Sequence, residues 1–115
     1  MKESMHMVMD IGYKNFKKEV VESDMPVIAD FWASWCSPCL ILAPVFKELS
    51  EDPAFKGKLK FVKINTEEEP ELTQKHFISG IPCLVIMDKG KETGRIVGFA
   101  SKEQLKRKIE AELKK

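Results

Sequence analysis

Hydrophobic and polar residues follow one another along the chain in segments that predict strands and helices in turn. Residues 26–32 are mainly β-branched and aromatic, without polar alternation, which is typical of a central strand covered on both faces. Residues 58–64 predict a second strand, and residues 84–87 and 93–97 predict two more. Near the N-terminus, residues 5–9 predict a short strand with a methionine-lined face.

Helical spacing of apolar residues separates these strands. Asp10 is expected to cap a first helix over residues 12–22. Its core-facing positions are expected to be Tyr13, Phe16, Val20 and Val21. A second helix is expected to start at the cysteine pair and to continue over residues 40–50. Pro44 should kink this helix because proline removes one backbone hydrogen bond.

Two further signals predict the remaining helices. The acidic residues 67–69 before Pro70 suit the first turn of a short helix, and we interpret them as a solvated helix start. Ser101 and Gln104 have the spacing of a capping box. The final helix is expected to bury Leu105, Ile109 and Leu113.

The predicted order is therefore β-α-β-α-β-α-β-β-α. Alternating strands and helices require parallel crossovers, whereas a turn at Gly90 makes the last two strands a hairpin. These rules predict an α/β fold with a mixed central sheet and helices on both faces. No repeat, linker or low-complexity segment divides the chain, so residues 1–115 are expected to form a single domain.

Composition narrows the classes of function. The 115 residues carry 19 Lys and Arg against 18 Asp and Glu, and the net charge of +1 gives no support to nucleic acid or a membrane surface as the main partner. Three cysteines do not make a secreted disulfide framework. The N-terminus lacks the apolar core of a signal peptide, and no apolar run is long enough for a bilayer. We therefore expect a cytoplasmic protein with catalytic or metal-binding cysteines.

The candidate chemistry lies in Cys36 and Cys39, which follow an apolar strand and open an apolar helix. Two cysteines at this spacing can close a small disulfide or hold half of a metal site. Free backbone N–H groups and the helix dipole stabilise a thiolate at a helix N-terminus, which lowers its pKa. We therefore predict Cys36 to be the thiolate and Cys39, three residues further on, to be more buried and within reach of it. Pro38 fits the first turn because its missing N–H has no helical partner there.

Asp30 interrupts the central apolar strand. Either it is partly exposed near the end of that strand, or it is a buried acid with a raised pKa that serves proton transfer. His76 is expected to be a surface or packing residue.

The segment Trp35-Cys36-Ser37-Pro38-Cys39 resembles the active-site motif of thioredoxins, whose usual form has Gly where Ser37 stands. Matching pieces extend over nearly the whole chain: Asp30-Phe31-Trp32-Ala33, Pro44, Lys63, Ile81-Pro82 and Gly98. The resemblance implies a thioredoxin-like fold. It also implies a thiol–disulfide oxidoreductase that reduces protein disulfides through a reversible Cys36–Cys39 dithiol/disulfide, without a cofactor.

The resemblance also implies roles for single residues. Cys36 is then the exposed nucleophile and Cys39 the resolving thiol, while Asp30 assists proton removal from Cys39 with Lys63 close by. The Ile81–Pro82 bond is expected to be cis. The groove for the partner protein is expected to be bordered by Trp35, Ser37, Pro38, Ile81, Pro82 and Gly98. The implied partners are protein disulfides and a thioredoxin reductase, and we expect a monomer.

Three residues depart from the family pattern. Ser37 puts the redox potential in question, Leu40 stands where a basic residue is common, and Cys83 stands where Thr is common. Cys83 is either a small buried apolar residue or a third sulfur near Cys36.

Other functions remain open at this stage. Cys36, Cys39 and Cys83 offer ligands for zinc or an iron–sulfur cluster, with His76 or His6 as a fourth. A disulfide isomerase or oxidase would use the same two cysteines at a less reducing potential. A non-catalytic domain would use only the groove around Trp35 and Pro82.

Overall fold

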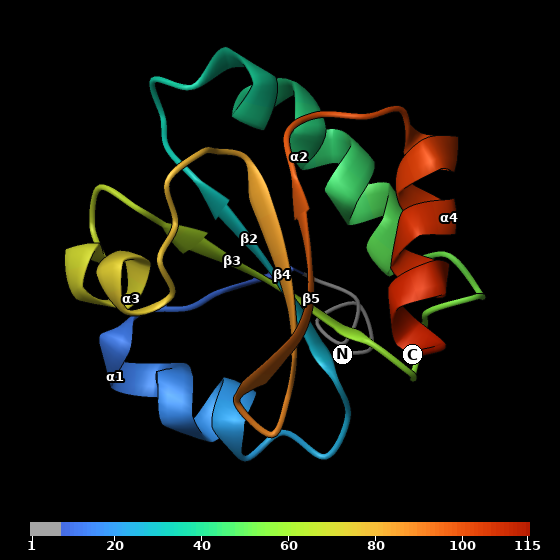
Figure 1. Ribbon diagram of the computed structural model, residues 1–115, viewed down its shortest axis with the longest axis horizontal. Helices are drawn as coiled ribbons and strands as arrows, with labels where there is room; N and C mark the ends of the chain where they lie inside the picture. Colours follow the sequence, from blue (N-terminus) through green and yellow to red (C-terminus); the bar gives the residue numbers. More distant parts are fainter. Residues whose placement is uncertain (1–7) are drawn as a thin grey trace, which may run out of the picture.

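A computed structural model describes residues 8–115 of the protein. Its sheet has five strands in the order β1-β3-β2-β4-β5, shown in Figure 1. The strands are β1 (Met9–Asp10), β2 (Val27–Trp32), β3 (Lys60–Asn65), β4 (Cys83–Asp88) and β5 (Lys91–Val97). Strands β1, β3 and β2 are parallel, and β4 runs antiparallel to both β2 and β5. The predicted mixed sheet is confirmed, whereas residues 5–7 of the predicted first strand, with His6, lie outside the described residues.

The helices follow the predicted order. They are α1 (Tyr13–Phe16), continued by the π-helical turn η2 (Lys17–Val21), then α2 (Ser37–Ser50), α3 (Pro70–Lys75) and α4 (Lys102–Leu113). Pro44 lies inside α2 as expected, and Ser101 caps α4 by accepting a hydrogen bond from the Gln104 N–H. No helix in residues 8–115 has both the length and the apolar character needed to cross a membrane.

Two hydrophobic cores fill the two sides of the sheet because successive residues of a strand point to opposite faces. In β2, Ile28 packs against Leu42 and Phe46 of α2, and this core also holds Leu105 and Ile109 of α4. Ala29 and Phe31, on the other face of β2, join a core with Val20 of η2 and Leu72 of α3. Figure 1 shows α2 and α4 together on one side and α1 and α3 on the other.

The ends of helices α1 and α4 differ from the predictions. Asp10 does not cap α1: it lies in β1, and the cap is Gly12, whose N–H donates to the side chain of Asn15 at 2.7 Å. Tyr13 is exposed, because Ile11 fills the adjacent core instead. Leu113 is the last residue of α4 and is 36% exposed, whereas Leu105 and Ile109 are fully buried as predicted.

The tight turn between β4 and β5 sets the direction of the last strand. Lys89 and Gly90 both have positive φ, at 56° and 85°, which is the backbone twist that favours a two-residue hairpin. The pairing then places Phe31, Cys83 and Val97 side by side across three strands. As a result, the segments that follow β2 and β5 and the segment that precedes β4 meet at the same end of the sheet.

Candidate active site

Cys36 is the N-cap residue of α2, directly after the short segment that leaves β2. Its Sγ accepts a hydrogen bond from the Cys39 N–H at 3.3 Å, so the sulfur takes one of the backbone donors that have no partner within the helix. Cys36 and Cys39 form a disulfide whose Cα atoms lie 5.2 Å apart. The predicted position of the cysteine pair at the positive end of a helix is confirmed.

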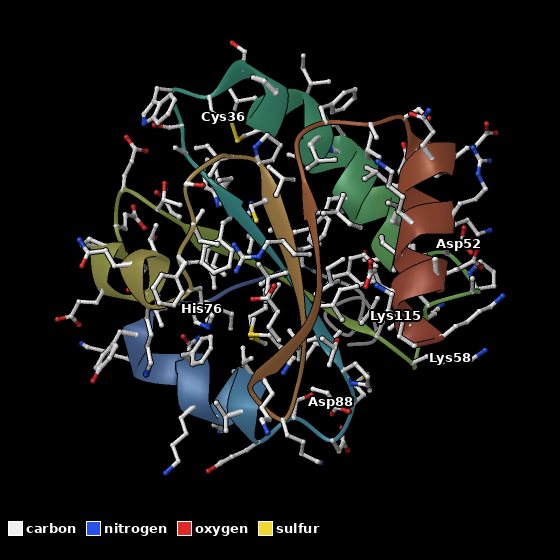
Figure 2. The ribbon with its side chains drawn as sticks, viewed as in Figure 1. Cys36, Asp52, Lys58, His76, Asp88 and Lys115 are labelled. Carbon is white, nitrogen blue, oxygen red and sulfur yellow. A yellow bond between two sulfur atoms is a disulfide. The ribbon has the colours of Figure 1, made fainter. Side chains whose placement is uncertain are left out.

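The prediction that Cys36 is exposed is wrong for the disulfide form. The residue is 4% exposed and Cys39 is 1% exposed, both within a small apolar cluster with Ala33. The side chains of Trp32 and Ile81 pack against this cluster and account for the burial. Figure 2 shows Cys36 at the end of the molecule opposite Asp88.

The loop before β4 lies against the disulfide. The Ile81–Pro82 peptide bond is cis, as expected, and the Ile81 carbonyl oxygen lies 3.8 Å from the Cys36 Sγ. At this distance a reduced Cys36 thiol can donate a hydrogen bond to that oxygen. Gly98, with a φ of 90°, donates its N–H to the Pro82 carbonyl oxygen at 2.9 Å and ties the end of β5 to the same loop.

Other residues predicted for the site lie around the disulfide at varying exposure. Trp35, Ser37 and Pro38 are exposed, Ile81 and Gly98 are partly buried, and Pro82 is buried. Trp35 precedes the disulfide, and Ser37 and Pro38 lie between its two cysteines.

Asp30 is buried in β2, on the face of the sheet that α2 covers, since Ile28 two residues earlier packs against α2. Its Oδ1 accepts no hydrogen bond within residues 8–115. Burial raises the pKa of this carboxyl to about 7, and the positive charge of Lys63 acts in the opposite direction. Asp30 is therefore buried and not partly exposed, whereas its role in proton transfer stays a prediction.

Lys63 is the register partner of Asp30 on β3. Its ammonium lies 4.0 Å from Asp10 Oδ1 and 5.3 Å from the centre of the Trp32 ring. The lysine therefore supplies positive charge beside Asp30 while its own contacts are with Asp10 and Trp32.

Glu67 has a structural role that no pattern in the sequence predicts. Its Oε1 accepts hydrogen bonds from the Ser34 N–H at 3.0 Å and the Ser34 hydroxyl at 2.8 Å, and these bonds lower the pKa of the Glu67 carboxyl. The segment between β2 and Cys36 is thereby fixed to the loop before α3. The acidic run is thus more than a solvated helix start, and nothing in the spacing of two polar residues 33 positions apart indicates their contact.

Cys83 is fully buried at the start of β4, in the core that includes its neighbour Phe31. This burial raises the pKa of its thiol, with Arg95 opposing the change. In the part of the chain that the structure describes, no three His, Cys, Asp or Glu side chains are grouped so that they could hold a metal ion. The three cysteines therefore do not form the cluster that the metal-site alternative requires.

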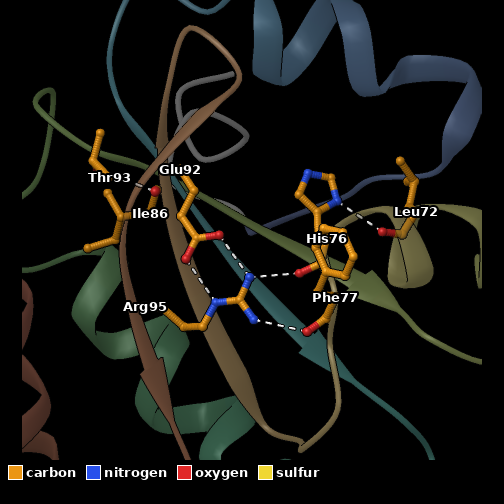
Figure 3. A network of polar contacts seen from close by, with 7 residues as sticks. All are labelled: Leu72, His76, Phe77, Ile86, Glu92, Thr93 and Arg95. Carbon is orange, nitrogen blue, oxygen red and sulfur yellow. Dashed lines mark hydrogen bonds and ion pairs between the residues drawn. The ribbon is translucent and has the colours of Figure 1, made fainter.

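His76 is a packing residue at the end of α3, as predicted. Its ring lies 5.4 Å from that of Phe16 and 5.7 Å from that of Phe31, and its Nδ1 is 2.9 Å from the Leu72 carbonyl oxygen. Arg95 donates to the carbonyl oxygens of His76 and Phe77 and pairs with Glu92, as shown in Figure 3. These bonds attach the segment that leads to Ile81 and Pro82 to β5.

Comparison with known proteins agrees with this geometry. The family model named Thioredoxin matches residues 7–111. The chain is 42% identical over 98 residues to Thioredoxin 1 of a Nostoc species, covering 85% of this chain and 90% of the relative. It is 39% identical over 99 residues to the thioredoxin of Rickettsia bellii, covering 86% and 92%. The chain belongs to the thioredoxin family.

One of the relatives is a chloroplast protein. The chain is 37% identical over 103 residues to Thioredoxin M4, chloroplastic, of Arabidopsis thaliana, covering 90% of this chain and 52% of that protein. As a thioredoxin with its Cys36–Cys39 disulfide formed, the protein is a thiol–disulfide oxidoreductase and a protein-disulfide reductase. Protein disulfides and a thioredoxin reductase are the general kind of partner for this family.

Proposed function

We propose that Cys36 is the nucleophile and Cys39 the resolving thiol in the reduction of protein disulfides. The observation that carries this assignment is the position of the Cys36 Sγ at the N-terminus of α2, where it accepts the Cys39 N–H. The Cys36 thiolate attacks one sulfur of the partner disulfide and releases the other as a thiolate. The Cys39 thiolate then attacks the Cys36 Sγ and releases the second partner sulfur. Two electrons pass to the partner, and the Cys36–Cys39 disulfide remains.

Asp30 is proposed as the acceptor of the Cys39 proton. Because its pKa is raised to about 7, a carboxylate at this buried position is both available near neutral pH and basic enough to take a thiol proton. Lys63 is proposed to keep part of the Asp30 population ionised, since its positive charge acts against the effect of burial. Asp30 lies on the face of β2 that α2 covers, which supports this role.

The partner protein is proposed to dock across the groove bordered by Trp35, Ser37, Pro38, Ile81, Pro82 and Gly98. The support for this groove is the hydrogen bond between Gly98 and Pro82 and the 3.8 Å separation between Cys36 and Ile81. We further propose that residues 1–115 act as a single monomeric domain in the cytoplasm, where a thioredoxin reductase renews the dithiol.

The test is reduction of insulin disulfides with dithiothreitol as the electron source, followed by turbidity. The wild-type protein should accelerate the reaction, Cys36→Ser should abolish the acceleration, and Cys39→Ser should accumulate a mixed disulfide through Cys36. Cys83→Ala is the matched control and should retain activity, because Cys83 is buried in the core with Phe31, on the face of the sheet that α2 does not cover. Full activity of Cys36→Ser would refute the assignment.

A further inference from the structure

The end of the sheet that carries the disulfide has almost no charge. No Lys, Arg, Asp or Glu occurs in residues 31–46, 77–87 or 96–101, although these residue types make up 32% of the chain. Strand pairing brings these three segments to the same end of the sheet. Charge near this end comes from the loop before α3, where Glu67 is exposed beside Ser34 and is followed by the exposed Glu68. It also comes from Lys63, whose partly exposed ammonium lies 5.3 Å from the centre of the Trp32 ring and is paired with Asp10.

Helix α2 presents an uncharged and mainly apolar stripe that begins at the disulfide. Its buried positions are Cys39, Leu42, Phe46 and Leu49, and its opposite face exposes Ser37, Leu40, Ile41 and Pro44. Leu40 is 51% exposed and Ile41 is 60% exposed. The four exposed residues share one face at helical spacing and cover about 10 Å along the axis. On the other flank of the site, Val97 and Phe99 are also exposed.

We propose that this α2 stripe (Ser37, Leu40, Ile41 and Pro44) selects protein disulfides whose neighbouring residues are apolar. The inference rests on the proposed function, and it extends the docking surface beyond the groove at Trp35 and Pro82. Because Ser37 directly follows Cys36, a partner that docks in the proposed groove can extend the residues beside its disulfide along this face. Apolar neighbours gain burial there, whereas charged neighbours lose water and meet no opposite charge, except for basic ones near Glu67.

The absence of charge also determines how partners arrive. Opposite charges on two proteins raise the association rate, and added salt removes that gain. No basic side chain lies in the three segments, and the nearby Lys63 is paired with Asp10. Acidic partners therefore receive no such attraction, and the acidic pair Glu67 and Glu68 acts against them. Selection therefore depends on apolar contact, and the rate with apolar partners should be insensitive to salt.

The experiment uses three disulfide peptides that differ only in the residues beside their cysteines: leucine, glutamate or lysine. The second-order rate constant for oxidation of the reduced protein is measured with each peptide at low and high NaCl. The wild-type protein should react about tenfold faster with the leucine peptide than with the glutamate peptide, and salt should change the leucine rate less than about twofold. Leu40→Lys should reduce this preference about tenfold and give the glutamate reaction a salt dependence.

Leu113→Lys is the matched control, since it is the same exchange at an exposed leucine at the far end of α4. It should leave the preference unchanged. The ratio between peptides is the readout because any change in the reactivity of Cys36 affects all three equally. Equal rates with all peptides, or an unchanged ratio in Leu40→Lys, would overturn the inference while leaving the proposed function intact. Failure of the wild-type protein to reduce any peptide or insulin would instead refute the proposed function.

Discussion

Asp30 shows how one buried residue couples the chemistry of the site to the stability of the fold. The carboxyl lies in the central strand, and its Oδ1 finds no hydrogen bond donor in residues 8–115. Water stabilises the charged form in the unfolded chain, whereas the protein interior penalises it. An ionised Asp30 therefore destabilises the folded state, and this cost is compatible with a role in proton transfer.

Asp30→Asn should therefore be more stable than the wild type at high pH. The pKa is about 7 in the folded protein and 3.8 as the ordinary value, so the wild type loses stability as pH rises from about 4 to about 7. Above pH 7 the ionised Asp30 lowers the free energy of unfolding of the wild type by its full amount, roughly 4 kcal/mol at 1.36 kcal/mol per pKa unit. Denaturant unfolding of both oxidised proteins at pH 4 and pH 9 measures the difference.

Asp52→Asn provides the opposite control. Hydrogen bonds from the Ala54 N–H and then from Lys106 lower the pKa of the Asp52 carboxyl, so its contribution is present at neutral pH and is lost in acid. This variant should be less stable than the wild type at neutral pH, with a smaller difference in acid. If Asp30→Asn were less stable than the wild type at pH 9, Asp30 would not be an unsatisfied buried acid.

Glu67 gives a second prediction for a single residue. Glu67→Ala removes Oε1, the acceptor of both Ser34 hydrogen bonds, so the Ser34 amide should exchange its hydrogen faster with solvent. Hydrogen exchange followed by NMR measures this amide. Glu68→Ala is the matched control and should leave the exchange rate unchanged, because within residues 8–115 the Ser34 amide donates to Glu67 and not to Glu68. Equal effects of both variants would mean that Glu67 does not hold this segment.

Among the elements, helix α4 carries both buried and exposed leucines. Leu105 is fully buried in the core beside α2, whereas Leu113 lies at the end of the helix and is exposed. Leu105→Ala should cost about 2–5 kcal/mol of unfolding free energy, because it removes apolar contacts and leaves a cavity. Leu113→Ala should cost less than about 1 kcal/mol. Chemical denaturation of the two variants compares them directly, and equal losses would contradict the packing of α4.

The order and type of the elements could be predicted from the sequence because apolar periodicity is a local property. Residues 26–32, 84–87 and the helix after Ser101 all proved close to their predicted bounds. The errors lie at helix ends, where a single contact decides the outcome: Gly12, whose N–H donates to the Asn15 side chain, is the cap of α1 in place of Asp10. The contact of Glu67 with Ser34 depends on two loops that meet only after folding, so no local pattern reveals it.

For the whole molecule, the sheet order decides which cysteines can meet. The reversal of β4 relative to β2 brings Pro82 to the end of the sheet beside Cys36, yet turns the next residue, Cys83, into the core that holds Phe31. The sequence left two alternatives for Cys83 because strand alternation around it cannot be assigned until the register is known. In the folded protein it is a buried apolar residue.

Thiol counting tests this arrangement. The folded, oxidised protein should show almost no reaction with a thiol reagent, because Cys36 and Cys39 are bonded and Cys83 is buried with a raised pKa. In denaturant the oxidised chain should show one thiol, and after reduction it should show three. A fast-reacting thiol in the folded oxidised protein would mean that Cys83 is accessible.

The proposed mechanism depends on the activation of Cys36 by the N-terminus of α2. Its most direct test is the pH dependence of alkylation of the reduced protein by iodoacetamide, compared with Cys36→Ser and Cys83→Ala. The account predicts one thiol that ionises below the ordinary value of about 8.5, present in the wild type and in Cys83→Ala and absent in Cys36→Ser. If every thiol of the reduced protein ionised at or above that value, Cys36 would not be an activated nucleophile and the proposed mechanism would be contradicted.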